Sequence, residues 1–162
     1  MIDQQIDIAT KDGKTTTFIT HPERGGPFPV IIFYMDAPAI REELRDMARR
    51  LGTSGYYVML PNMYYRSGVM EIGPIPPDPE APQRKRMFEF MNSINIPMVM
   101  EDTKALLAYA ETQEAANTKI VGTVGYDAIF GDATGVLWLV DVVETIAGEG
   151  FGKFLVVCLC GG

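Results

Sequence analysis

Two unbroken apolar runs on either side of a helical pattern constrain most strongly what this chain can fold into. Residues 30–35 and 56–60 are continuously apolar or aromatic, which is typical of parallel strands buried on both faces. Between them an amphipathic pattern opens after Pro38 and predicts a helix over 40–51, with apolar positions Ile40, Leu44, Met47, Ala48 and Leu51. A strand, a helix and a strand with short joints predict a right-handed βαβ unit and therefore a parallel sheet.

The rest of the chain extends this unit into a single α/β domain covering 1–162. The alternation over 2–8 and 15–20, with a turn at Lys11-Asp12-Gly13, predicts an antiparallel hairpin at the edge of the sheet. Further patterns predict helices over 83–94, 97–113 and 136–147 and strands over 119–125 and 153–160. We therefore expect a mostly parallel sheet with an N-terminal antiparallel hairpin and helices on both faces.

Composition excludes several classes of function. The net charge of −7 disfavours binding to nucleic-acid phosphates. The apolar stretches are shorter than the ~20 residues that cross a bilayer, so no membrane partner is expected. Cys158 and Cys160 lie too close together to crosslink the fold, which favours a reducing cytoplasm, and no other ligands accompany them to form a metal site. The glycines of 148–152 fit neither phosphate-loop spacing, so we expect no cofactor.

A long segment rich in proline and glycine, residues 67–82, separates the strand at 56–60 from the next helix. Loops of this length in a compact domain are usually functional. We expect it to act as a lid-like loop.

Several short sequence motifs resemble those of the dienelactone hydrolase family, and they occur in the same order and at similar spacing. They are Pro27-Phe28-Pro29-Val30-Ile31-Ile32-Phe33, Met35 to Arg41, Ala48 to Leu51, Ser54 to Val58, Leu60 to Arg66 and Ile120 to Tyr126. The resemblance covers roughly residues 1–126. It implies a partial α/β-hydrolase fold and an enzyme that cleaves small carboxylic esters or lactones with a Cys or Ser nucleophile, a His base and an Asp.

The chain departs from that family at the nucleophile. The elbow, G-x-Nu-x-G, would read Gly125-Tyr126-Asp127-Ala128-Ile129, so Asp127 stands at the nucleophile position and Ile129 replaces the second glycine. The single histidine, His21, lies far upstream, and the triad is not matched. We treat 127–162 as a divergent C-terminal segment of an apparently truncated chain, and a reading-frame change at the elbow is one explanation.

Candidate site residues follow from the strand ends. Asp127 is either a carboxylate nucleophile or an ordinary helix-capping aspartate. Asp36 matches a position that supports the nucleophile and oxyanion site in the family, and its alternatives are a helix N-cap or an ion pair with Arg41. Arg66, beside Tyr65, matches a substrate-carboxylate contact of the family, and a guanidinium suits that task. The alternative for Arg66 is a solvated loop arginine, and we group Arg66, Tyr65 and Arg41 as substrate-binding residues.

Three functions remain open from the sequence. The first is a hydrolase of small esters or lactones, with impaired or no activity in this chain. The second is a truncated or divergent paralogue without catalysis. The third is a binding or assembly module, in which a homo-oligomer forms through an exposed sheet edge.

Overall fold

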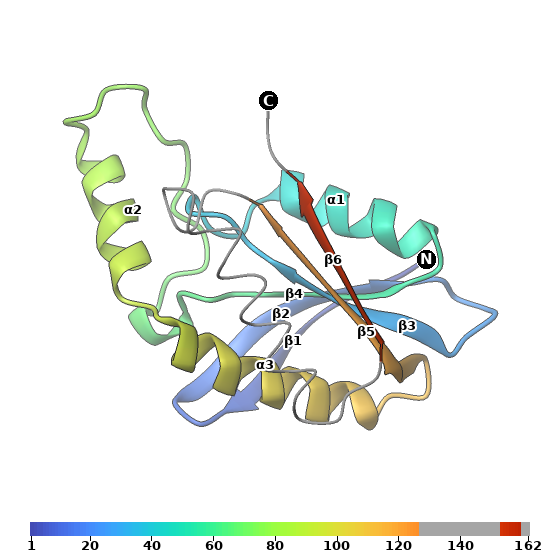
Figure 1. The fold of residues 1–162 in the computed structure, drawn as a ribbon. Helices are drawn as coiled ribbons and strands as arrows, with labels where there is room; N and C mark the ends of the chain where they lie inside the picture. Colours follow the sequence, from blue (N-terminus) through green and yellow to red (C-terminus); the bar gives the residue numbers. More distant parts are fainter. Residues whose placement is uncertain (127–152, 160–162) are drawn as a thin grey trace.

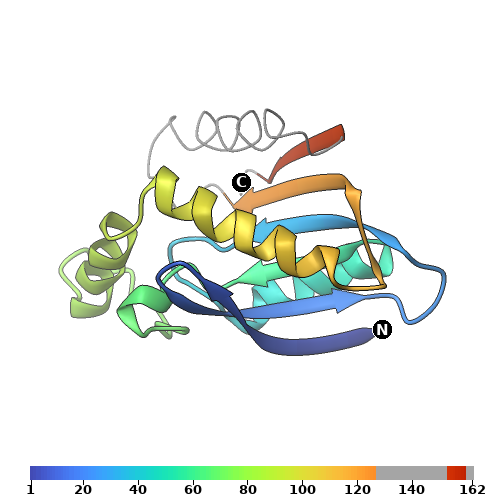
Figure 2. The same cartoon turned by 90° about the horizontal axis from the view of Figure 1, so that it is seen from below.

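A six-stranded mixed sheet organises the chain, and the computed structural model describes residues 1–126 and 153–159 of it. The strand order is β1-β2-β4-β3-β5-β6, with β1 (Ile2–Thr10) at one edge of the described sheet and β6 (Lys153–Leu159) at the other. Strands β3 (Phe28–Tyr34), β4 (Tyr57–Pro61), β5 (Ala116–Tyr126) and β6 run parallel, as the apolar runs predicted. Figure 1 labels the strands, and Figure 2 shows them one below the other in this order, from β6 at the top to β1 at the bottom.

The predicted N-terminal hairpin is confirmed. Strand β1 pairs antiparallel with β2 (Gly13–His21), Thr10 lies opposite Gly13, and Lys11 and Asp12 form the turn. Gly13 has a φ of 150°, which favours glycine at the exit of this tight turn. Strand β2 then pairs antiparallel with β4, so that the hairpin becomes the antiparallel edge of a parallel sheet.

Helices cover both faces of the sheet, as expected. Helix α1 (Glu42–Thr53) lies against β2 and β4, and α3 (Ile96–Glu111) lies against β1 and β5 on the opposite face. In Figure 2, α3 passes in front of the strands and α1 lies behind them. Helix α2 (Pro82–Asn92) projects beyond the sheet next to α3 (Figure 1).

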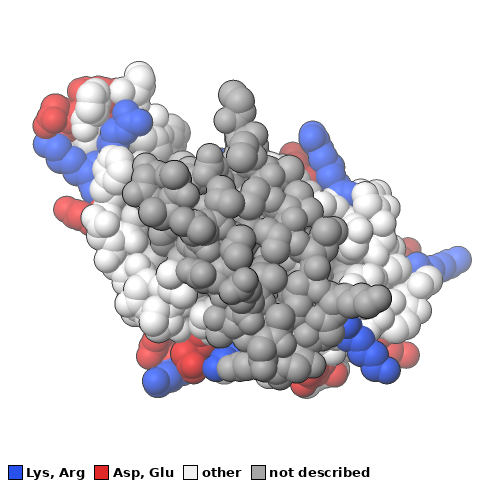
Figure 3. Space-filling model, in the orientation of Figure 1, with Lys and Arg blue, Asp and Glu red and all other residues white. Residues whose placement is uncertain are grey.

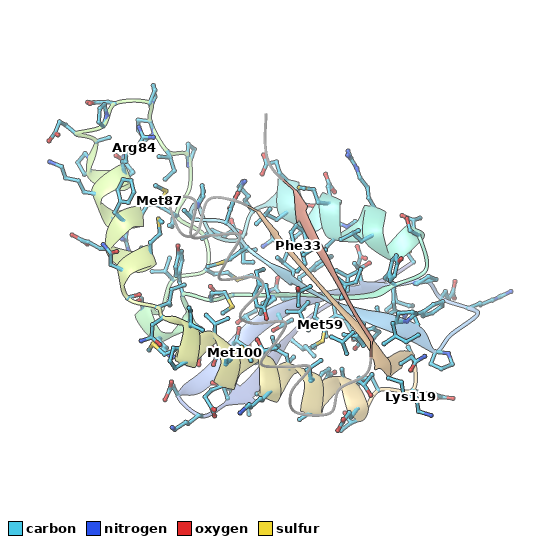
Figure 4. All side chains as sticks on the ribbon, viewed as in Figure 1. Phe33, Met59, Arg84, Met87, Met100 and Lys119 are labelled. Carbon is cyan, nitrogen blue, oxygen red and sulfur yellow. The ribbon has the colours of Figure 1, made fainter. Side chains whose placement is uncertain are left out.

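The core lies between these layers and explains why the strands read as continuous apolar runs. Every residue of β4 is buried, and so are the last five of β3. Phe33 and Met59 lie in the sheet and Met100 on α3 (Figure 4). The core is completed by side chains of both helices, among them Leu44, Ala48, Val99, Leu106, Leu107 and Ala110. Burial of a leucine or valine side chain contributes about 1.5–3 kcal/mol.

Helix boundaries differ slightly from the sequence patterns. Helix α1 begins at Glu42, two residues after the expected start at Ile40. The reason is that Ala39 adopts a left-handed backbone with φ 70° and Arg41 is extended, so the chain turns before the helix begins. Helix α3 starts as expected with Pro97 in its first turn, and the Asn95 side chain accepts a bond from the N–H of Met98 at 3.1 Å.

The predicted helix over 136–147 lies outside the described residues. The segment between the short 3₁₀ turn η1 (Tyr65–Ser67) and α2 contains no helix or strand in the part of the chain that the structure describes, in line with the predicted loop over 67–82. Its role as a lid stays a prediction.

Candidate functional site

The carboxyl ends of the parallel strands bring most of the predicted site residues to one edge of the sheet. Asp36 follows β3, Tyr65 and Arg66 follow β4, and β5 ends at Tyr126, directly before Asp127. Asp127 itself lies outside the described residues, so its role as a nucleophile or a helix cap stays a prediction. Ligands of open α/β sheets bind at this edge, which makes it the place to search for a site.

Asp36 is buried and its carboxylate is held by Arg41. Both guanidinium Nη atoms contact it, Nη1 with Oδ1 and Nη2 with Oδ2 at 2.6 Å. The Nη1 group also donates to the carbonyl of Ala39 at 3.2 Å. Two parallel charge-assisted bonds of this kind are among the strongest side-chain contacts in proteins. The ion pair with Arg41 is thus confirmed, and the N-cap alternative for Asp36 is wrong, because α1 is preceded by Arg41 and has no side-chain cap.

Two buried residues that the sequence reasoning did not single out, Tyr64 and Asn62, lie at the same edge of the sheet, and Tyr64 is close enough to Asp36 to feel its charge. The Tyr64 hydroxyl donates to the carbonyl of Ala37 at 3.1 Å, and the backbone N–H of Tyr64 donates to Asn62 Oδ1 at 3.0 Å. Burial, together with the nearby charge of Asp36, raises the pKa of the Tyr64 phenol above its ordinary value. A polar residue directly after a buried strand was the available signal for Asn62.

Arg66 is held by two carboxylates of the chain. Its Nη1 and Nη2 groups donate to Oδ2 and Oδ1 of Asp102 at 2.8 and 2.9 Å, and Asp102 is 1% exposed. Its Nε and Nη2 groups also reach Asp12 Oδ2 on the hairpin turn, at 2.8 and 2.7 Å. Burial alone would lower the pKa of Arg66, but the hydrogen bonds to Asp102 and Asp12 raise it. Arg66 is therefore not a solvated loop arginine, and contact with a substrate carboxylate stays a prediction.

Tyr65 belongs to the same network. Its hydroxyl donates to Asp102 Oδ1 at 2.8 Å and lies 2.8 Å from the hydroxyl of Thr10, while the Arg66 guanidinium stands 4.5 Å from the centre of its ring. Burial, with a further contribution from Asp102, raises the pKa of Tyr65 to about 12. The Tyr65 hydroxyl therefore keeps its proton at neutral pH and acts as a hydrogen-bond donor.

His21 does not join these groups. It ends β2 and stacks on Tyr57, the first residue of β4, with ring centres 5.1 Å apart. Its Nδ1 lies 2.8 Å from the carbonyl oxygen of Pro22. Tyr57 pairs with Val30 and Val30 with Val121, so His21 stands at the amino ends of the parallel strands. From Val121 to Tyr126 the strand rises about 17 Å, at roughly 3.3 Å a residue, which separates the imidazole from the edge that carries Asp36 and Arg66.

Two hollows lie between the turn that follows Asp36 and the loop that precedes α2, and Pro38 of that turn lines both. The larger, of about 460 Å³, is mostly apolar and lies between the loop and α2, where its walls include Ile75, Pro76, Pro77, Met87, Phe88 and Met91. The smaller, of about 440 Å³, is more polar and touches Arg41, Glu43, Glu71 and Gly73. Volumes of a few hundred Å³ suit small ligands. Arg84 and Met87 face the larger hollow from α2 (Figure 4).

No cluster of three or more His, Cys, Asp or Glu side chains arranged for a metal occurs among the described residues. In residues 1–126 and 153–159, no helix is long and apolar enough to cross a membrane. Lys, Arg, Asp and Glu side chains are interspersed on the part of the molecular face that Figure 3 shows in colour.

Comparison with known proteins places this geometry in a family. The model of the dienelactone hydrolase family matches residues 15–148. A protein of Methylorubrum extorquens, provisionally named carboxymethylenebutenolidase, is 28% identical over 127 residues, which cover 78% of this chain and 41% of that protein. One from Synechocystis with the same provisional name is 23% identical, covering 75% of this chain and 48% of that protein. The chain thus spans less than half the length of these two curated relatives.

Solved structures share the fold. The crystal structure of a provisionally assigned dienelactone hydrolase from Klebsiella pneumoniae superposes with a TM-score of 0.65 at 21% identity, over 77% of this chain and 49% of that one. A dienelactone hydrolase-like promiscuous phosphotriesterase from metagenomic libraries gives a TM-score of 0.62 at 12% identity, over 99% and 82%. The matched family model covers well over half of the chain and includes Asp36, Arg66 and the end of β5, and the chain belongs to the dienelactone hydrolase family.

Proposed function

We propose that this chain is the scaffold of a hydrolase of small carboxylic esters or lactones whose turnover is impaired or absent. Membership of the family supports the reaction class. The observation that carries the loss of turnover is the position of His21, the chain's single histidine, at the amino ends of the parallel strands. An acyl-transfer site needs a base within hydrogen-bond reach of its nucleophile, and such a base contributes typically a hundredfold to ten-thousandfold.

The nucleophile position supports the same proposal. Asp127 follows the last residue of β5 and replaces the Cys or Ser that the family resemblance implies. A carboxylate nucleophile forms an ester intermediate, and release of that intermediate requires an activated water. His21 stands about 17 Å of strand away from that end of β5, too far to activate this water.

The residues around the site favour a small neutral substrate. Arg66, which the sequence suggested as a carboxylate contact, holds Asp102 of the chain itself, and Arg41, which the sequence grouped with it as a substrate-binding residue, holds Asp36. The apolar hollow between residues 75–77 and α2, which Ala37 and Pro38 also line, fits the acyl or alcohol part of an ester. We therefore propose that the ligand enters through apolar contacts.

Hydrolysis of 4-nitrophenyl acetate by the purified chain, beside its Asp127→Ala variant, tests the proposal. We expect a folded chain, verified by circular dichroism, to release nitrophenol no faster than a heat-denatured sample. Activity that disappears with Asp127→Ala would show that the carboxylate is a working nucleophile and would overturn the proposed loss of turnover.

A second candidate function is a binding or assembly module. The observation that favours it is the position of β6 at the edge of the described sheet, where a further strand of a second copy would pair in parallel or antiparallel register. We propose a homo-oligomer formed through this edge. Gel filtration with light scattering would give a dimer mass if so, and a monomer at all concentrations would remove this candidate.

Two further proposals concern the protein in the cell. A cytoplasmic location follows from the sequence argument on Cys158 and Cys160, and cell fractionation would test it. The origin of 127–162 is also open to test. The family match continues to residue 148, and sequencing of the source transcript beyond codon 126 would show whether the reading frame is intact.

A further inference from the structure

The segment between Glu71 and Pro77 is a strap fastened at both ends. At its start, Glu71 forms a bridge with Ala39 and accepts a bond from Arg45 at 2.6 Å. At its far end, the carbonyl of Pro77 accepts a bond from Arg84 of α2 at 3.0 Å. The strap therefore spans from the turn before α1 to α2, across the edge of the sheet where Asp36 lies.

Hydrogen bonds to other described residues do not hold the middle of the strap. In the part of the chain that the structure describes, no hydrogen bond involves residues 73–76. Two of these four residues are prolines, Pro74 and Pro76, which have no N–H to donate. Gly73 has a φ of 83°, a conformation that glycine adopts at little cost, and a Cβ there would meet nothing within 4 Å. Gly73 is thus placed as a pivot.

Ile75 stands at the centre of this strap and separates the two hollows. It lines the apolar hollow of about 460 Å³ together with Phe88 and Met91, and it also lines the hollow of about 440 Å³ together with Arg41. Pro38, at the turn after β3, lines both hollows as well. Ile75 is only partly buried.

We propose that Ile75 is a gate that limits the length of the ligand. With the strap down, Ile75 divides the space and the apolar hollow accepts only a short apolar group. With the strap lifted at Gly73, the hollows join into one groove that accepts a longer, unbranched apolar chain. The inference rests on the proposed function in taking the ligand to be the apolar part of a small ester, and it makes Ile75 a specificity-determining residue.

Displacement of the neutral fluorescent probe N-phenyl-1-naphthylamine by n-alkanols of increasing length tests the gate without ester cleavage. Each methylene buried in an apolar site tightens binding about fourfold. For the wild-type chain we expect the gain to stop at the length that fills the apolar hollow. For Ile75→Ala the gain should continue over longer chains, and for Ile75→Trp it should stop earlier. Ile96→Ala, an exposed isoleucine outside both hollows, should match the wild type.

Two results would overturn the gate. One is an identical length profile for the wild type and both Ile75 variants. The other is a folded wild-type chain that binds no probe, because the apolar hollow would then take no apolar ligand. Cleavage of esters by the chain would overturn the proposed loss of turnover and leave the length profile unaffected, so the two failures are distinguishable.

Discussion

The ion pair between Arg66 and Asp102 gives the sharpest test of how the site edge is held together. The Asp102 side chain is 1% exposed and the Arg66 side chain 14% exposed, so the pair is largely removed from water. Replacing Arg66 with methionine leaves the Asp102 carboxylate buried. Of the hydrogen bonds to Asp102 described above, the one from the Tyr65 hydroxyl remains. Breaking one side of a buried pair costs about 3–5 kcal/mol. Because Arg66 is partly exposed, we expect Arg66→Met to lower the free energy of unfolding by about 3 kcal/mol.

Urea unfolding at pH 7, followed by circular dichroism, measures this change. Lys85→Met is the matched control, because Lys85 and its partner Glu80 have side chains 59% and 80% exposed and such pairs contribute less than about 1 kcal/mol. The double variant Arg66→Met with Asp102→Asn removes the uncompensated charge and should regain part of the loss. The reasoning is refuted if Arg66→Met costs no more than Lys85→Met, or if the double variant is no more stable than Arg66→Met.

Three further predictions follow from contacts described above. Arg41→Gln should lower the free energy of unfolding by about 2–4 kcal/mol in urea titrations, because the buried Asp36 loses both of its guanidinium bonds; an unchanged midpoint would contradict this. The pKa of Tyr65 is raised to about 12 in the folded chain from 10.0, so the contribution of Tyr65 to stability is fully present below pH 10 and is lost as the pH rises through 12. Tyr65→Phe should therefore flatten the fall of the unfolding free energy between pH 10 and 12. An equal slope in the wild type and the variant would argue against this prediction. Gly52→Ala in α1 should raise Tm slightly or leave it unchanged, because alanine is more favourable than glycine in a helix by up to ~1 kcal/mol. The atom closest to the added Cβ is Cε of the exposed Met1, which can move away. A clear drop of Tm in thermal melts would contradict this prediction.

Much of the fold could be predicted because local patterns and burial agree in it. The apolar run at 30–35 became β3, the amphipathic stretch at 40–51 became most of α1, and the run at 119–125 lies within β5. The start of α1 was misplaced because Ala39 adopts a left-handed backbone, which alanine rarely does, while Arg41 reaches back to Asp36. The sequence offered the Asp36–Arg41 pair as one alternative, but nothing in it signalled the left-handed turn that delays the helix.

The site was less predictable than the fold, because its contacts join distant parts of the chain. Arg66 was expected at the edge of the sheet, and it lies there. Its partner Asp102 is 36 residues away on α3, and nothing in the spacing of the sequence connects them. The location of His21 also required the structure, since only the register of β2 with β4 shows that the imidazole lies at the amino ends of the parallel strands.

The most direct test of the central claim compares 4-nitrophenyl acetate hydrolysis by the wild-type chain and by His21→Phe. Phenylalanine keeps an aromatic ring to stack on Tyr57 and removes the only imidazole of the chain. We expect equal rates, both at the level of a heat-denatured control, with matching circular dichroism spectra. A wild-type rate above that control that falls to it in His21→Phe would contradict the account, because His21 would then be acting as a base.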